Sequence, residues 1–388
     1  MAPHTIVVLG AGLGGIPITH WLMKHQVPTN KDLKVVLVSP TSELFWNIAA
    51  PRAVLPGALP DDKVFYPIAS NFAKYPQHES QFEFIVGKAE ALDPTSQTVT
   101  VAEVPGGAHR SVRYDTLVVA TGSSARADMP WKSLGSTQET KEALRKLQKA
   151  IGAAKHIVVA GGGQTGSELA GELGSEYAAK GLKQVTFVID DDLPLTADAR
   201  RDVRQAIASR LESFKVRIVR SARVTASSVE GGKTVLELTS RDGGKKQQSL
   251  EADLYLPTVG LVPNSDFAPS SMLDAQGRFK QTASLRAEGF GNVFVLGDVG
   301  NLQTATAKHA GDQVQHLTKV LGPYLSGGQK AEPAYKADNG PMFAVTLGKS
   351  HGIGQMGTWK LWSWLVAMVK SKHMGTNMAP DSVTGAKM

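Results

Sequence analysis

Runs of apolar residues followed by glycine-rich turns divide the start of the chain into predictable elements. Residues 5–9 read TIVVL, a β-branched run typical of a strand buried on both faces. A glycine turn at 10–15, an amphipathic stretch to residue 23 and the apolar run KVVLV at 34–38 follow. This order predicts a strand, a turn, a helix and a second strand, which together form a βαβ unit.

The same pattern occurs a second time in the middle of the chain. HIVVA at 156–160 is followed by the glycine turn GGGQTG at 161–166, a helical stretch and the strand-like run QVTFVI at 184–189. Two units this far apart predict two separate dinucleotide-binding folds rather than a solenoid repeat.

Strand-rich sections follow each unit. Residues 82–118 run into YDTLVVATG at 114–122, and residues 216–256 run into the related LYLPTVG at 254–260. These two sections predict further strands in each fold.

The last hundred residues are more varied. NVFVLGD at 292–298 predicts a buried strand, and a helix is expected near 307–322. Two short strands after Pro341 precede TWKLWSWLVAMVK at 358–370, and we expect the polar tail beyond it to be loose. The fold class expected from all these patterns is α/β, with two Rossmann-like domains and a small α+β C-terminal segment.

The composition excludes several kinds of catalytic and binding site. The 388 residues include no cysteine, which excludes a redox-active disulfide, a thiolate metal site and a cysteine nucleophile, and no metal site is expected. The net charge of +7 is modest for this length and forms no long Lys/Arg block, so we expect no nucleic-acid surface.

The N-terminus shows no recognisable targeting signal. Met1 to His4 lead directly into the first apolar strand, which predicts no signal peptide, and Ala2 in place of glycine excludes N-myristoylation there. No stretch approaches the roughly 20 apolar residues that a transmembrane helix needs.

The glycine turns match the GxGxxG pattern of pyrophosphate binding. Its first glycine permits the tight turn, its second lets the backbone approach the phosphates, and its third lets helix and strand pack closely. The helix N-terminus then faces the anion with free N–H groups. The candidate binding residues are Gly10, Gly12, Gly14 and Gly15 in the first unit and Gly161, Gly163 and Gly166 in the second.

The residue that ends the second strand of each unit normally contacts a ribose. In the second unit Asp190 stands 29 residues after Gly161, and an acid there favours NADH over NADPH, although Arg200 and Arg201 are close enough to weaken that preference. In the first unit the same spacing from Gly10 reaches Ser39, which carries no charge and departs from the usual acidic residue.

The order of these motifs resembles the two-dinucleotide-binding-domain flavoproteins, which include glutathione-reductase-like and type II NADH dehydrogenase enzymes. The resemblance implies FAD in the first unit and NADH or NADPH in the second. It implies that Asp298 bonds the ribityl chain of FAD and that Thr121 and Gly122 pack against FAD. Gly260, in the LYLPTVG run, is a further candidate cofactor-binding residue.

The resemblance also implies a domain plan. Residues 1–125 and 258–335 would form the two parts of the FAD-binding domain, and residues 126–257 the NAD(P)H-binding domain. Residues 336–388 would form a C-terminal segment that faces a membrane and the quinone.

A narrower resemblance extends over nearly the whole chain. WNIAAPRAVLPG at 46–57, HIVVAGGGQTGSELAGEL at 156–173, NVFVLGDVGNLQT at 292–304 and GIGQMGTWKLWSWLVAMVKSK at 352–372 are similar to the ferroptosis-suppressor, or AIF-homologous mitochondrion-associated, family. Members reduce ubiquinone-like quinones and vitamin K with NAD(P)H. The resemblance implies that Arg52 touches FAD and that Lys370 lies near the quinone.

Three further positions carry two interpretations each. By resemblance to type II NADH dehydrogenases, Glu168 approaches the nicotinamide, but an acid in the first helical turn can equally complement the helix dipole. Lys308 and His309 begin a helix that related flavoproteins point at the flavin, where positive charge stabilises the anionic reduced form; either could instead be a solvated first-turn residue.

The tryptophan-rich run at 358–370 is too short to span a bilayer, and its Trp and Lys content favours contact with a membrane surface. A core helix packed on the FAD domain and a homodimer contact are the alternatives. We therefore expect a cytoplasmic protein that is peripheral on a lipid droplet, the mitochondrial outer face or the plasma membrane.

The function that these observations favour is an FAD-dependent NAD(P)H:quinone oxidoreductase. Since disulfide reductases, sulfide:quinone reductases and NADH peroxidases pass electrons through cysteine, the flavin here must reduce its acceptor directly. An NADH-dependent reductase of a soluble ferredoxin-like carrier and a non-catalytic NAD(P)H- or DNA-binding cell-death effector are the alternatives.

Overall fold

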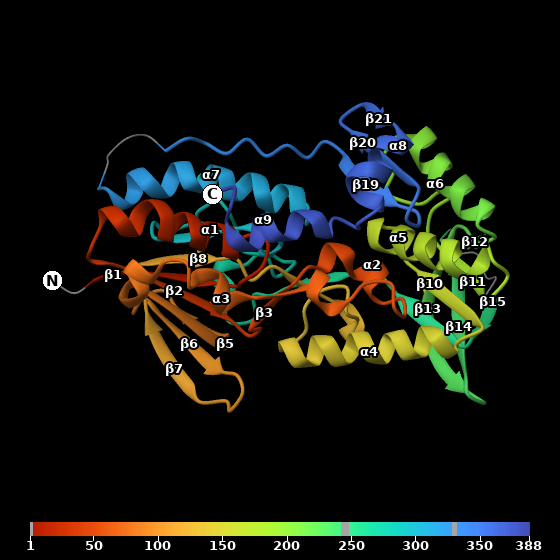
Figure 1. Ribbon diagram of the computed structural model, residues 1–388, viewed down its shortest axis with the longest axis horizontal. Coiled ribbons are helices and arrows are strands. Elements are labelled where there is room, and N and C mark those ends of the chain that lie inside the picture. The colour runs from red at the N-terminus through yellow and green to blue at the C-terminus, as the bar shows by residue number, and fades with distance from the viewer. Residues whose placement is uncertain (1–2, 242–247, 328–331) are drawn as a thin grey trace.

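Two β-sheets, one mixed and one parallel, form the framework of the protein (Figure 1). The computed structural model describes residues 3–241, 248–327 and 332–388. The predicted α/β class is confirmed, because each sheet is built around one of the two glycine-turn units and carries helices beside it.

The first sheet has seven strands in the order β18-β8-β1-β2-β5-β6-β7. The first five of that order pair in parallel, and β6 and β7 extend the sheet as antiparallel strands. The strands are β1 (His4–Leu9), β2 (Leu33–Ser39), β5 (Phe82–Asp93), β6 (Thr98–Glu103), β7 (His109–Arg113), β8 (Thr116–Val119) and β18 (Val293–Val295). β1, β8 and β18 are buried on both faces, as their apolar sequences predict.

The second sheet has four parallel strands in the order β12-β11-β10-β16, and a three-stranded antiparallel sheet packs beside it. The parallel strands are β10 (His156–Ala160), β11 (Gln184–Val188), β12 (Arg217–Val219) and β16 (Leu254–Pro257). The antiparallel strands are β13 (Ala222–Glu230), β14 (Lys233–Ser240) and β15 (Gln248–Ala252). Short pairs join β9 (Ser123–Ala125) to β17 (Leu261–Pro263) and β3 (Glu43–Phe45) to β4 (Phe65–Pro67).

The helices cover the sheets and connect the units. α1 and α7 lie side by side over the first sheet, while α5 and α6 flank the second (Figure 1). The larger helices are α1 (Gly15–Trp21), α4 (Thr137–Ala153), α5 (Gln164–Leu173), α6 (Arg201–Ser213) and α7 (Ala307–Leu325). The shorter ones are α2 (Ala50–Ala53), α3 (Ile68–Phe72), α8 (Ser363–Val366) and α9 (Ala379–Thr384).

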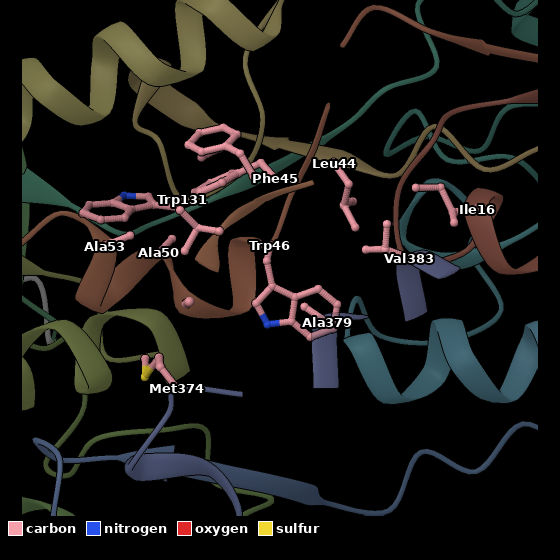
Figure 2. Packing of buried hydrophobic residues seen from close by; sticks show 14 of the residues in the cluster. Ile16, Leu44, Phe45, Trp46, Ala50, Ala53, Trp131, Met374, Ala379 and Val383 are labelled. Carbon is pink, nitrogen blue, oxygen red and sulfur yellow. The ribbon is translucent and has the colours of Figure 1, made fainter. Parts of the chain in front are cut away.

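One hydrophobic cluster runs through both units. It contains Ile6 and Val35 from the first sheet and Ile157 and Val185 from the second, all at most 2% exposed. Helix α2 of the first unit packs on α5 of the second. The two folds therefore share a core where they meet, and Figure 2 shows part of it around Phe45, Trp46 and Trp131.

The C-terminal residues form two separate structures. β19 (Met342–Thr346), β20 (Gly352–Met356) and β21 (Trp359–Leu361) make an antiparallel sheet that contacts α5 and α6. The run 358–370 is not one helix: it contains β21, then α8 and a π-helical turn, Ala367–Ser371.

The prediction of a loose tail is wrong. Residues beyond 372 include α9, which packs between α1 and α3, and its Ala379 and Val383 are 0% and 1% exposed. The apolar spacing of these two residues, one helical turn apart, gives the short helix a face that can be buried. No described helix is long and apolar enough to cross a membrane.

Candidate functional site

A continuous cavity of about 2120 Å³ runs between the two units. Single-ligand pockets are usually about 300–1,000 Å³, so this cavity has room for two large ligands. Both glycine motifs line it, through Gly10, Gly12 and Gly14 from the first and Gly163, Gln164 and Thr165 from the second.

The glycines of the first motif have distinct geometric roles. Gly10 has φ +98°, which side chains rarely adopt, and a Cβ on Gly15 would lie 1.7 Å from the Gly10 carbonyl oxygen. A Cβ on Gly12 would meet nothing within 4 Å and would occupy the cavity. A Cβ on Gly14 would be in ordinary contact with Leu296.

The second motif repeats this geometry. Gly161 has φ +119°, a Cβ on Gly166 would lie 1.9 Å from the Gly161 oxygen, and a Cβ on Gly163 would meet nothing within 4 Å. Neither α1 nor α5 has a side-chain cap at its N-terminus. Their free N–H groups therefore suit the pyrophosphate of a dinucleotide in each unit.

The two strand-end residues lie in different surroundings. Ser39 is buried on the cavity wall, and its hydroxyl accepts a hydrogen bond from the Thr41 backbone N–H at 3.3 Å and lies 3.1 Å from the Thr41 hydroxyl. Asp190 is exposed, and its carboxylate pairs with Arg223 at 3.2 Å. The first site thus has a neutral group at this place and the second a charged pair.

The acids next to Asp190 are also paired. Asp191 binds Arg204 at 3.0 Å and Arg241 at 3.1 Å, and it accepts the Asp192 backbone N–H. That backbone hydrogen bond and the two guanidinium groups hold the pKa of Asp191 below its usual value. Each acid of the run 190–192 is therefore paired with at least one arginine within the protein itself.

Asp298 stands on the cavity wall at the end of β18, where resemblance places the ribityl contact. Its Oδ2 accepts hydrogen bonds from Lys132 Nζ and from Ser123 Oγ, both at 2.8 Å. Lys132 was not predicted, because no motif surrounds it and it lies 166 positions from Asp298. Two donors, one of them an ammonium group, are therefore directed at a single carboxylate oxygen of Asp298.

Three other predicted residues also line the cavity. The Thr121 hydroxyl donates to the Asn264 carbonyl at 2.7 Å, and the Asn264 amide donates back to the Thr121 carbonyl at 2.9 Å. Gly122 has φ +66° and Gly260 has φ +80°, and both face the cavity next to these residues. The reciprocal pair fixes the backbone turn after β8.

Arg52 lies away from the cavity wall and is 1% exposed. Its Nε and Nη2 each donate to a Glu172 oxygen at 2.7 Å, and its Nη1 donates to the Lys372 carbonyl at 3.2 Å. Burial raises the pKa of Glu172, and the bidentate guanidinium opposes that rise. Arg52 thus joins the first unit, the second unit and the C-terminal chain at Lys372. Its contact with FAD stays a prediction.

Glu168 and Lys370, predicted separately, meet at 2.7 Å although they are 202 residues apart. Both line the cavity, and Glu168 is 5% exposed. Lys370 Nζ also donates to the Ala344 carbonyl at 2.7 Å, and the Thr346 backbone N–H donates to Glu168 at 3.1 Å. The pair places an ammonium and a carboxylate together where the second unit meets the C-terminal sheet.

The N-terminus of α7 faces the cavity through Thr306, Ala307 and Lys308. The Thr306 hydroxyl caps the helix by accepting the His309 backbone N–H at 3.1 Å. Lys308 is paired with Asp312, one turn along the helix, and its side chain is 40% exposed. Lys308 is therefore a partly exposed first-turn residue that also lies on the cavity wall.

The tryptophan-rich run presents its apolar side chains to solvent. Trp359, Trp362 and Trp364 are 75%, 69% and 63% exposed, which removes the interpretation of a buried core helix. We call the exposed hydrophobic residues of this region the apolar patch; they are Met342, Met356, Trp359, Trp362, Trp364, Met368 and Val369. No described group of side chains could hold a metal ion.

Comparison with known proteins agrees with this arrangement. A family model described as pyridine nucleotide-disulphide oxidoreductase matches residues 4–314. Oxidoreductase ptaL of Pestalotiopsis fici is 36% identical over 385 residues, 99% of this chain and 99% of the relative. Ferroptosis suppressor protein 1 of Xenopus tropicalis is 26% identical over 379 residues, 95% of this chain and 93% of the relative.

Among solved structures, the sulfide:quinone oxidoreductase from Aquifex aeolicus has the same fold. The TM-score is 0.77 at 17% identity, and the match covers 98% of this chain and 92% of that chain. The resemblance to ferroptosis suppressors and to two-dinucleotide flavoproteins, first seen in the motifs, is confirmed.

Proposed function

The chain belongs to the pyridine nucleotide-disulphide oxidoreductase family and is an FAD-dependent NAD(P)H oxidoreductase, and we propose that its acceptor is a quinone taken from a membrane surface. The structural neighbour from Aquifex aeolicus carries a quinone acceptor in its name. The absence of cysteine supports direct reduction of the acceptor, because no thiol relay is available.

The first unit would hold FAD, through the backbone around Gly12, the turn at Thr121 and Gly122, and Asp298. The second unit would hold NADH or NADPH through the backbone around Gly163. This assignment follows the predicted domain plan, with residues 1–125 and 258–335 around FAD and 126–257 around the coenzyme. The chemistry that a bound flavin would supply is acceptance of a hydride from the reduced nicotinamide and transfer of two electrons to an acceptor.

The observation that carries the quinone proposal is that the cavity reaches the apolar patch. Its lining includes Met342 and Val369, which belong to the exposed apolar patch, and Leu361 beside them. Lys370 lies at the same end. An apolar acceptor held in a bilayer could therefore enter the cavity without crossing water.

The apolar patch has the chemistry of a membrane-surface contact. The Trp362 and Trp364 rings stack with their centroids 6.1 Å apart and an interplanar angle of 12°. Clustered, exposed Trp and Met are rare on proteins that face only water, and Trp suits the interface between headgroups and acyl chains. This arrangement supports a peripheral position on a membrane.

Glu168 and Lys370 would supply the proton chemistry. Reduction of a quinone to a quinol takes up two protons as well as two electrons. Lys370 Nζ is a proton donor at the cavity wall, and Glu168 at 2.7 Å holds it in place and can share its proton. The buried Thr346 N–H keeps Glu168 oriented toward Lys370.

The proposal is tested by anaerobic mixing of the purified protein with NADH and then with a short-chain ubiquinone. We expect NADH to bleach the flavin absorbance and the quinone to restore it rapidly. Recovery only with a ferredoxin-like carrier would replace the proposal by the soluble-carrier alternative. A protein that purifies without flavin would overturn it.

The membrane part of the proposal has its own test. The double variant Trp362→Ser/Trp364→Ser should lose binding to anionic phospholipid vesicles and turn over a vesicle-bound long-chain quinone at least about tenfold more slowly, a change of 1.4 kcal/mol. Its rate with the soluble short-chain quinone should stay unchanged. Leu182→Ser, which removes an exposed hydrophobic residue outside the patch, is the matched control.

A further inference from the structure

The C-terminal segment Thr376–Met388 is folded onto the first dinucleotide unit. Its helix α9 packs against α1, the helix that begins at the first glycine motif, and against α3. Figure 2 shows Val383 pointing toward Ile16 of α1 and Leu44 of β3, and all three belong to one buried cluster. The segment is therefore an integral part of this unit.

Polar contacts from the first unit hold the segment in place. His20 of α1 lies with Nε2 2.8 Å from the Val383 carbonyl and Nδ1 3.1 Å from the Tyr75 hydroxyl. Lys74 donates to the Thr384 carbonyl and Lys24 to the Met388 carbonyl. The backbone of the segment is thus bound at three successive points.

The segment also forms part of the cavity wall. Met378, Asp381, Ser382, Lys387 and Met388 all line the cavity that the first glycine motif faces. Asp381 and Lys387 pair with each other at 3.0 Å. Five residues of one short segment therefore line the cavity.

A hydrogen-bond donor without an acceptor lies beside this wall. Trp46 is 2% exposed and lines the cavity, and its Nε1 has no hydrogen-bond partner within the described part of the chain. A Cβ on Gly375, just before the segment, would lie 3.8 Å from that nitrogen. Leaving a buried N–H unpaired costs about 1–3 kcal/mol, so Trp46 is held in this wall by the packing of its ring rather than by a hydrogen bond.

We propose that residues Thr376–Met388 close the FAD site of the first unit and retain the cofactor there. The segment covers the cavity beside α1, and the buried ring of Trp46 lies next to it in the same wall. Release of the segment opens this side of the cavity to water and lets FAD leave. The proposal depends on FAD in the first unit and not on the identity of the acceptor.

Gly385 allows the segment to be displaced without altering the cavity wall itself. It has φ +61°, and a Cβ there would lie 2.5 Å from the His20 side chain. Gly385→Val therefore forces the segment away from α1, and Gly385→Ala is a milder version of the same change. Gly231→Val is the matched control, because Gly231 also has positive φ, at +56°, but its Cβ would meet nothing within 4 Å.

The measurement is the rate at which FAD dissociates after dilution, followed by the rise of flavin fluorescence. We expect Gly385→Val to release FAD at least about tenfold faster than the wild-type protein, which corresponds to 1.4 kcal/mol if association is unchanged. Gly231→Val should release FAD at the wild-type rate. Trp46→Phe, which takes the N–H and the second ring of the indole out of the wall beside the segment, should also release FAD faster while its C-terminal segment stays resistant to limited proteolysis.

Two results would overturn the proposal. The first is a wild-type FAD dissociation rate in a folded Gly385→Val or Gly385→Ala variant whose C-terminus has become sensitive to protease. The second is unchanged FAD release together with faster reduction of the acceptor, because the segment would then control acceptor access. Since FAD release is measured without an acceptor, failure of the quinone proposal leaves this test intact.

Discussion

The two glycine motifs are nearly identical in backbone geometry and differ in what surrounds them. The third glycine of each lies against the carbonyl oxygen of the first, at 1.7 Å from a Cβ built on Gly15 and 1.9 Å from one on Gly166. The middle glycine of each, Gly12 or Gly163, faces open space. Both α1 and α5 then run into a π-helical turn. The two motifs therefore form the same pyrophosphate-binding turn, and we call each turn, with the helix N-terminus that follows it, a cradle.

The surroundings of the cradles diverge in charge. The first strand-end residue, Ser39, is neutral, buried and bonded to Thr41, whereas the second, Asp190, is exposed and paired with Arg223. A dinucleotide that stays bound through many turnovers needs retention, and one that exchanges at each turnover needs recognition from solution. The buried neutral site suits the first task and the charged, exposed site the second.

The C-terminal residues extend this difference. Ten positions after the first glycine of each motif, α1 carries His20 and α5 carries Gly171. His20 binds the Val383 carbonyl of the C-terminal helix, whereas a Cβ on Gly171 would lie 2.8 Å from Leu347 of the C-terminal sheet region. Both units are thus covered by C-terminal chain at equivalent places, but by different structures.

The largest effect is expected from the glycines that the two cradles share. Gly15→Ala and Gly166→Ala each place a Cβ on a backbone oxygen, and we expect each to lose about 4 kcal/mol or more of unfolding free energy. Gly12→Ala and Gly163→Ala should stay within about 0.5 kcal/mol of wild type, because their Cβ atoms meet nothing. Urea unfolding of the four variants measures both expectations.

The same four variants also separate the cradles by ligand. Gly12→Ala should lower FAD content without weakening coenzyme binding, and Gly163→Ala should do the reverse, since each Cβ enters a different part of the cavity. Absorbance spectra report FAD content, and equilibrium titration reports coenzyme binding. Loss of both ligands in one folded variant would contradict the assignment of one dinucleotide to each cradle.

The next largest effect is expected at the ion pair that joins the two units. Glu172→Gln leaves the Arg52 guanidinium buried without its counter-charge, and we expect a loss of about 3–5 kcal/mol of unfolding free energy. Glu176→Gln, one turn further along the chain, breaks an exposed pair with Lys180 and should cost at most about 1 kcal/mol. Equal losses in the two variants would show that the buried pair is not what holds the units together.

The third effect is a pH dependence of stability that comes from His20 in the first unit. Burial lowers the pKa of His20 from 6.5 to about 4, with Lys74 adding to the shift and the Val383 carbonyl opposing it. Between these values the unfolded chain binds a proton that the folded protein does not, so stability falls as pH decreases from 6.5 to 4. At 1.36 kcal/mol per unit the loss is about 3 kcal/mol.

His20→Gln should flatten this part of the pH profile, measured as urea unfolding free energy between pH 4.5 and 7. The same substitution at the exposed His109 serves as the control. A wild-type pH profile in His20→Gln would mean that other groups cause the acid sensitivity.

The smallest effect is expected at the strand ends. Arg223→Ala should lower kcat/KM for NADPH by about tenfold relative to NADH, because a 2′-phosphate needs a guanidinium whereas a freed Asp190 can bind the 2′-hydroxyl. Ser39→Ala should weaken FAD binding by about 1 kcal/mol at most, the value of one neutral hydrogen bond, and leave the coenzyme preference unchanged. If the ratio of kcat/KM for NADPH to that for NADH is unchanged in Arg223→Ala, residues other than Arg223 select the coenzyme.

Local patterns in the sequence predicted the parts of the site that depend on backbone geometry. The runs before Gly10 and Gly161 became parallel strands, and both glycine turns became uncapped helix N-termini. These features depend on nearest neighbours in the chain, and a glycine at a fixed spacing has few alternative uses. Glu168, Lys370 and Asp298 line the cavity, but resemblance rather than any local rule predicts them, and their roles stay predictions.

The contacts of these residues could not be predicted, because each partner comes from a distant part of the chain. Lys132 binds Asp298 across 166 positions, and no pattern around Lys132 distinguishes it from other surface lysines. The tail was misjudged for a related reason. Its polar composition suggests a loose segment. The two apolar residues that anchor it, Ala379 and Val383, are buried because α9 packs against α1 and α3, and the sequence does not reveal that contact.

The sequence by itself therefore determined two dinucleotide cradles and the absence of thiol chemistry, since periodicity, glycine spacing and residue type are local properties. Only the tertiary structure decided that Arg52 ties three parts of the chain together, that Glu168 meets Lys370, and that the C-terminal segment lies on the first cradle. Those outcomes depend on which buried charges and apolar faces come within contact distance when the two sheets pack. That packing is determined by residues far apart in the sequence and not by any local pattern.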